Sequence, residues 1–189
     1  MRPLFRPATA LALAAALAGC SGTTAYRYKQ YYAMIQPIVS YDKSYEDTRV
    51  AFQFEITEKK IFVDIANIGG EPVTVDWPNV YLVDAEGISR HIVNDQVIFS
   101  KEVSRMKPTT IAPGAAERNL IVPVDSVEEL EQWTWYVKPL YTQTDDSAPL
   151  NLKKVFRVVI PVQAGSERRR YSFQFMVTDV IPYRGLSLG

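Results

Sequence analysis

Apolar and polar residues alternate over much of the chain after position 49, with the two-residue period of half-buried strands. In the stretch 49–56, Val50, Phe52, Phe54 and Ile56 alternate with small or polar residues. Successive side chains of a strand point to opposite faces, so one face of this segment is apolar and the other is solvated. The pattern predicts a strand here, with Phe54 in the core.

Similar short runs follow at close spacing, separated by turn residues such as Asp84-Ala85-Glu86-Gly87 and Pro113-Gly114. The clearest hairpin joins residues 155–162 to 171–177 through a glycine-containing turn at 164–166. The further predicted strands are 60–66, 73–77, 80–83, 88–93, 117–122 and 133–141. Residues 127–132 are predicted to form a single helical turn, whereas 31–38 fits either a helix or a strand and 95–107 either a strand or a loop.

Short strands with turns at this spacing predict an all-β domain of roughly seven to nine strands. The pattern resembles an immunoglobulin-like antiparallel β-sandwich, although the cysteine pair of antibody domains is absent. A lipocalin-like barrel is the alternative. It requires a regular series of hairpins, which Pro78, Pro113 and Pro123 interrupt.

The first 19 residues have the three parts of a secretory signal. Arg2 and Arg6 supply positive charge, residues 8–17 are uncharged and mostly apolar, and small residues follow. Leu17-Ala18-Gly19-Cys20 resembles the lipobox of bacterial lipoproteins. That resemblance implies cleavage before Cys20 by signal peptidase II and attachment of diacylglycerol to its thiol, detectable as palmitate labelling. Segments 67–91 and 110–122 are also similar to segments of small bacterial lipoproteins of uncharacterised function.

The resemblance implies a signal peptide at 1–19 and a lipidated tether at 20–29. The strand pattern places the β-sandwich at 30–181, and the glycine-containing segment 182–189 is predicted to be a flexible tail. The alternatives to the lipid anchor are an ordinary cleaved signal with a chance cysteine and a single membrane span, but the apolar run is shorter than the roughly 20 residues that a span requires. Two acyl chains suffice for stable anchoring. Ser21 follows the cysteine directly, and in this it resembles lipoproteins that Gram-negative hosts sort to the outer membrane. The predicted location is therefore the periplasmic face of the outer membrane.

The composition limits the ligands and reactions that we expect of the mature protein. The chain has 21 basic and 21 acidic residues, and removal of Arg2 and Arg6 leaves 19 basic residues against 21 acidic ones. A nearly neutral surface gives no reason to expect nucleic-acid binding. Cys20 is the only cysteine and His91 the only histidine, and no Gly-x-Ser-x-Gly motif accompanies them. We therefore expect no enzyme, metal site or cofactor.

Two groups of residues are candidate partner contacts. Arg168, Arg169 and Arg170 adjoin the turn of the last hairpin, and Trp133 and Trp135 share one face of a predicted strand. The arginines are alternatively a solvated edge that discourages strand addition, and the tryptophans are alternatively core residues.

Tyrosine is also frequent near the N-terminus of the mature chain, at positions 26, 28, 31, 32, 41 and 45. These side chains either cover an edge of the sandwich or form a contact surface. The resulting hypothesis is a lipid-anchored envelope module that holds a partner protein near the membrane. The alternative is a periplasmic carrier of a lipid or glycan. A pocket favours the carrier, and an exposed apolar patch on a filled domain favours the partner module.

Overall fold

The computed structural model describes residues 27–131 and 134–183, and in these residues the protein is all-β, as the alternating pattern predicted. Four short 3-10 helices accompany the strands: η1 (Trp77–Asn79), η2 (Val103–Arg105), η3 (Val124–Ser126) and η4 (Ala148–Asn151). The strands are β1 (Tyr28–Gln36), β2 (Ser44–Glu46), β3 (Val50–Ile56), β4 (Ile61–Asn67), β5 (Val73–Val75), β6 (Tyr81–Val83), β7 (Ser89–Val93), β8 (Thr109–Ile111), β9 (Ala116–Pro123), β10 (Val127–Glu131), β11 (Thr134–Val137), β12 (Val155–Ala164) and β13 (Glu167–Pro182).

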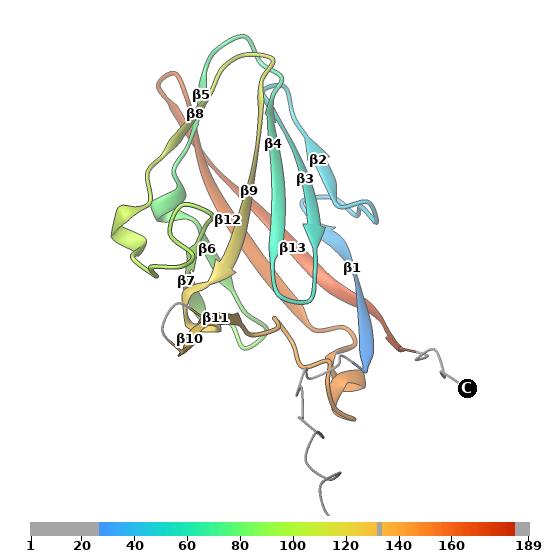
Figure 1. Cartoon of the computed structure of the whole chain (residues 1–189). Coiled ribbons are helices and arrows are strands. Elements are labelled where there is room, and N and C mark those ends of the chain that lie inside the picture. Colours follow the sequence, from blue (N-terminus) through green and yellow to red (C-terminus); the bar gives the residue numbers. More distant parts are fainter. Residues whose placement is uncertain (1–26, 132–133, 184–189) are drawn as a thin grey trace, which may run out of the picture.

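Nine strands form one antiparallel path in the order β1-β13-β12-β6-β7-β9-β4-β3-β2 (Figure 1). Strand β5 pairs with β12 and with β8, while β10 and β11 form a separate hairpin. The path curls so that its two halves face each other. They are joined through β7 and β9, by the residue pairs Ile92–Pro123 and Val93–Val122. The sheet is therefore nearly closed and barrel-like.

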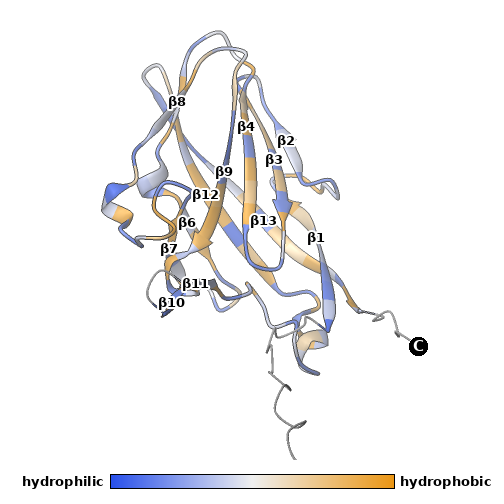
Figure 2. Cartoon of the chain, in the orientation of Figure 1, coloured by the Kyte–Doolittle hydropathy of each residue, from blue (hydrophilic) through white to orange (hydrophobic). Residues whose placement is uncertain are grey.

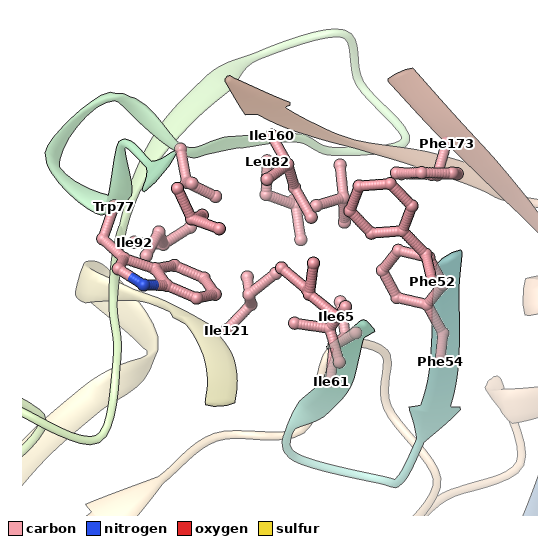
Figure 3. Packing of buried hydrophobic residues seen from close by; sticks show 14 of the residues in the cluster. Phe52, Phe54, Ile61, Ile65, Trp77, Leu82, Ile92, Ile121, Ile160 and Phe173 are labelled. Atoms are coloured by element: carbon pink, nitrogen blue, oxygen red, sulfur yellow. The ribbon is translucent and has the colours of Figure 1, made fainter. Parts of the chain in front are cut away.

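The core lies between the two halves of the curled sheet. Phe52 and Phe54 of β3 face Phe173 and Phe175 of β13, with ring centroids 4.8 Å apart for Phe52–Phe173 and 5.0 Å for Phe54–Phe175. Figure 3 shows Phe52, Phe54 and Phe173 at one end of the core and Trp77 at the other, with aliphatic side chains between them. Phe54 is 1% exposed, which confirms its predicted place in the core.

The alternation predicted from sequence matches the burial of individual strands. On β3, Val50, Phe52 and Phe54 are buried while Gln53 and Glu55 are exposed. Polar and apolar residues are interleaved along the strands in the same way in Figure 2. The last hairpin forms where it was predicted, although its second strand begins at Glu167 and not at Tyr171; Val155–Ala164 pairs with Glu167–Met176 without a shift. These elements are confirmed because a single buried face imposes the period of two.

The structure contradicts one predicted element and decides between the alternatives for two others. The predicted helical turn at 127–132 is wrong: Val127–Glu131 is strand β10, which pairs with β11. Glutamates favour helix only weakly, and here cross-strand pairing together with the burial of Val127 prevails over that preference. Residues 31–36 belong to β1, and 95–107 contains turns and η2.

Both ends of the described chain lie at the same end of the domain (Figure 1). Tyr28 pairs with Pro182, and the Tyr183 amide donates a hydrogen bond to the Arg27 carbonyl over 2.6 Å. Strand β1 thus begins inside the predicted tether, and β13 ends at the first residue of the predicted tail. Cys20, the signal segment and residues 184–189 lie outside the described residues. No helix among the described residues is long and apolar enough to cross a bilayer.

Candidate functional site

A pocket of about 380 Å³ lies near the end of the domain where both termini leave. Its apolar wall includes Leu82 of β6, Leu140 and Tyr141 of the segment after β11, and Phe156 of β12. Thr142 also lines it, and the next residue, Gln143, accepts backbone hydrogen bonds from Arg27 and Tyr28. Pockets of about 300–1,000 Å³ are the usual size for small ligands.

Ionic side chains surround this apolar wall. Arg90 donates from Nε to Asp84 Oδ2 over 2.6 Å and also pairs with Asp125. Lys138 pairs with Glu128, which lies on the neighbouring β10. Burial raises the pKa of Asp84, but the Ile88 amide and the Arg90 guanidinium outweigh it, so the pKa lies below its usual value. The two ion pairs of Arg90 join the β6–β7 turn to η3, and the Lys138–Glu128 pair lies beside them.

Two charged groups of the pocket have no ion-pair partner within the described part of the chain. These are the carboxylate of Glu86 and the ammonium group of Lys154. Lys154 Nζ lies 5.5 Å from the centroid of the Tyr141 ring, in a cation–π arrangement. The charged lining comprises three acids and three bases, so its formal charge is balanced.

The hydroxyl of Tyr141 is buried and has no hydrogen-bond partner among the described residues. Burial raises the pKa of Tyr141, and the carboxylates of Glu86 and Asp84 raise it further. The side-chain amide of Gln143, two residues on, is also buried without a partner. A buried polar group without a partner costs about 1–3 kcal/mol. Tyr141 and Gln143 therefore place two buried polar groups without hydrogen bonds close together in the sequence.

The three predicted arginines lie at the opposite end of β13 from the termini, and all are exposed. Arg169 pairs with Asp47 over 2.8 Å, and Arg168 lies 3.5 Å from Asp76. Arg168 and Arg170 line a hollow of about 250 Å³ together with Asp76. Two of the three side chains are therefore engaged within the protein.

Trp135 is half-buried on β11 and packs against the core. Its ring centroid lies 6.4 Å from that of Phe99, and Lys101 Nζ lies 5.9 Å from it. These contacts agree with the core-packing interpretation for this side chain. Trp133 lies outside the described residues.

Sequence analysis missed a polar cluster centred on Asp47, in the turn between β2 and β3. One carboxylate oxygen accepts the amides of Arg49 and Val50, over 2.8 and 3.0 Å. The other accepts bonds from Arg169 and from the Tyr171 hydroxyl, each over 2.8 Å. The cluster ties the two halves of the sheet together, and residues more than 120 positions apart gave no local signal for it.

Sequence analysis named Tyr41 as a candidate contact residue but missed the apolar loop to which it belongs, defined here as residues 37–43 between β1 and β2. Ile38, Val39 and Tyr41 are 50%, 69% and 77% exposed. The loop is nevertheless held in place, because Met34 and Ser40 exchange two backbone hydrogen bonds of 2.9 Å. Its exposed side chains therefore occupy a fixed position beside the short end strand β2.

The other candidate chemistry gives no site. His91 is exposed on β7, where it pairs with Tyr81. Within residues 27–131 and 134–183, no group of three or more His, Cys, Asp or Glu side chains is placed to hold a metal ion.

Comparisons with known proteins do not assign a family. No protein-family model and no curated protein matches the chain. Among solved structures, the chain is similar to the X-ray structure of Northeast Structural Genomics Consortium target SoR45, at 12% identity and a TM-score of 0.29. The match covers 85% of this chain and 88% of the other. At that score the likeness carries no argument about function.

Proposed function

We propose that this protein is a lipid-anchored envelope module that holds a partner protein near the membrane, without enzymatic activity. The observation that supports it best is the apolar loop, whose exposed side chains belong to residues nearly adjacent in sequence. Runs of exposed apolar residues are uncommon on soluble proteins and mark interaction surfaces. Fully burying one aliphatic side chain of this size contributes about 1.5–3 kcal/mol to association.

The partner that this surface fits is an extended protein segment. Strand β2 ends the hydrogen-bonded path, and Ser44–Glu46 pairs on one side with β3. A segment added at such an edge gains main-chain hydrogen bonds, and its apolar side chains would lie against Ile38 and Val39. The proposed contact therefore combines backbone pairing with burial of the apolar loop.

The location of the arginines agrees with a protein partner better than with lipid headgroups. Arg169 and Pro182 stand 13 positions apart on β13, about 43 Å at 3.3 Å per residue. With lipid on Cys20, residues 20–26 would span at most about 25 Å. Since charges are screened beyond about 8 Å, we propose that Arg168–Arg170 face away from the bilayer.

Three finer proposals accompany this function. The anchor is diacylglycerol on Cys20 after removal of residues 1–19, and the location is the periplasmic face of the outer membrane. The fold is an immunoglobulin-like sandwich, which is supported by the two facing halves and by the short β7–β9 junction between them.

The test is cross-linking in intact cells from a photoreactive amino acid at position 41. We expect one recurrent adduct, which Ile38→Asp or Val39→Asp abolishes. Ile68→Asp is the matched control, because Ile68 is 49% exposed and lies on a different loop. Charge reversal at Arg168–Arg170 and Trp135→Ala test the contacts predicted from sequence. An adduct that persists in Ile38→Asp, or that Ile68→Asp removes equally, would contradict the proposal.

A further inference from the structure

Large apolar side chains are exposed at the end of the domain from which both termini leave. Leu150 and Leu152, in and directly after η4, are 76% and 47% exposed. Ile181 and Tyr183, at the end of β13 and directly after it, are 44% and 48% exposed. Single exposed apolar residues are normal, but a group of them in one place marks an interaction surface. We call these residues the terminal apolar surface.

Hydrogen bonds hold η4 beside the first part of β1 and the last part of β13. The Thr142 carbonyl accepts the Asn151 side chain over 2.7 Å and the Gln30 side chain, from β1, over 3.1 Å. The Lys153 amide donates to the Val177 carbonyl of β13 over 2.9 Å. In Figure 1, η4 is the orange helical turn at the lower end of the domain, near the start of β1. Leu150 and Leu152 are therefore exposed at the end where the described chain begins.

The length of chain before that end indicates what covers the surface. With lipid on Cys20, residues 20–26 can hold Arg27 no more than about 25 Å from the bilayer. The opposite end of the domain stands farther away, because the 16 residues of β13 alone extend for about 50 Å. We propose that the terminal apolar surface docks on the phospholipid interface, with Leu150 and Leu152 inserted below the headgroups. This inference rests on the proposed lipid anchor, and it adds a defined orientation of the domain on the membrane.

The polar residues around the surface suit zwitterionic headgroups. Lysines at 153–154 follow Leu152 directly, and aspartates at 145–146 precede Leu150 on the same segment, so the segment has no net charge. Lysine stems can lie along apolar groups while their ammonium ends stay in water, and tyrosine rings such as that of Tyr183 are frequent at membrane interfaces. Docking through apolar side chains therefore needs no anionic lipid and should be insensitive to salt.

The test couples the mature chain, residues 20–189, through the Cys20 thiol to a maleimide-bearing lipid in phosphatidylcholine vesicles. Cys20 is the only cysteine, so the coupling is specific. Because the coupling supplies the anchor, failure to dock is distinguished from failure of cells to attach lipid at Cys20. A photoreactive amino acid at position 150 should form an adduct with phosphatidylcholine. The control position is Ile68, which is 49% exposed in the β4–β5 loop at the opposite end of the domain (Figure 1).

Each outcome supports or overturns the inference. A lipid adduct at position 150 that exceeds the adduct at position 68 supports docking. With the photoreactive residue at position 152, Leu150→Asp should weaken docking about tenfold, because one leucine no longer leaves water, whereas Ile68→Asp should not. No lipid adduct at position 150, equal adducts at 150 and 68, or adducts only between two copies of the chain would overturn it. Adducts that require phosphatidylglycerol and disappear at high salt would overturn it as well, since they would indicate electrostatic binding. Thermal unfolding of each variant verifies that the fold is intact.

Discussion

Replacing Tyr141 by phenylalanine removes one oxygen atom from the pocket wall and keeps the ring that packs near Phe156, with centroids 6.4 Å apart. In the unfolded chain this hydroxyl is hydrated, whereas in the fold it is buried without a partner. The cost of such a group is about 1–3 kcal/mol, and the phenylalanine side chain does not incur it. We therefore expect Tyr141→Phe to raise the free energy of unfolding by about 1 kcal/mol.

Two other tyrosines provide controls for the same chemical change. The Tyr32 hydroxyl donates to Gln30 Oε1 over 3.0 Å, so Tyr32→Phe should lower the free energy of unfolding by about 1 kcal/mol. The Tyr171 hydroxyl donates to the Asp47 carboxylate, and its removal should cost more, about 1.5–3 kcal/mol. The three variants therefore differ in sign as well as in size.

The assay is equilibrium unfolding in urea, followed by tryptophan fluorescence, to which the fully buried Trp77 contributes. Equal slopes of free energy against denaturant would show that the variants share one unfolded reference state. A loss of 1 kcal/mol or more in Tyr141→Phe would refute the reasoning. It would mean that the hydroxyl has a stabilising partner in the folded protein.

Three further predictions concern the core, the Asp47 cluster and the anchor. Phe54→Ala should lower the free energy of unfolding by about 3–5 kcal/mol in the same urea assay, and a loss below about 1 kcal/mol would place this side chain outside the core. The amides of Val50 and Arg49, the Tyr171 hydroxyl and Arg169 overcome burial and lower the pKa of Asp47. A lowered pKa stabilises the fold fully at pH values above the unfolded pKa of about 3.9, so the deficit of Asp47→Asn should be full at neutral pH and shrink as the pH falls below that value and through the lower pKa of the folded state. A deficit independent of pH would contradict this assignment. Cys20→Ser should abolish metabolic palmitate labelling, and unchanged labelling would disprove the anchor.

Features that depend on neighbouring residues were predictable from the sequence. The turn at 84–87 formed as expected, because Asp84 accepts the amides of Glu86 and Ile88, and Gly87 adopts a φ of +81°. Gly114 likewise has a φ of +75°, in the left-handed region that suits glycine after proline. In each case the conformational requirement and the residue that meets it lie within one turn.

Features that depend on distant residues were not predictable. Val127–Glu131 reads as a helical turn because its glutamates favour helix, and only pairing with β11 makes it a strand. The pocket joins residues 82–90, 123–126 and 138–156, which become neighbours only when β6, η3 and β12 are in place. No short motif encodes that convergence, so the unpaired hydroxyl of Tyr141 was invisible in the sequence.

The two proposed surfaces are physically separate, so one can fail without the other. The apolar loop is held at Met34, whereas η4 reaches β1 through Thr142, whose carbonyl accepts a hydrogen bond from the Gln30 side chain. The substituted side chains are exposed and lie on different loops, so substitutions at the two sites should act additively. Ile38→Asp should therefore leave the lipid adduct at position 150 unchanged, and Leu150→Asp should leave the protein adduct at position 41 unchanged. A change of either kind would indicate that docking on the lipid governs how the partner reaches the apolar loop.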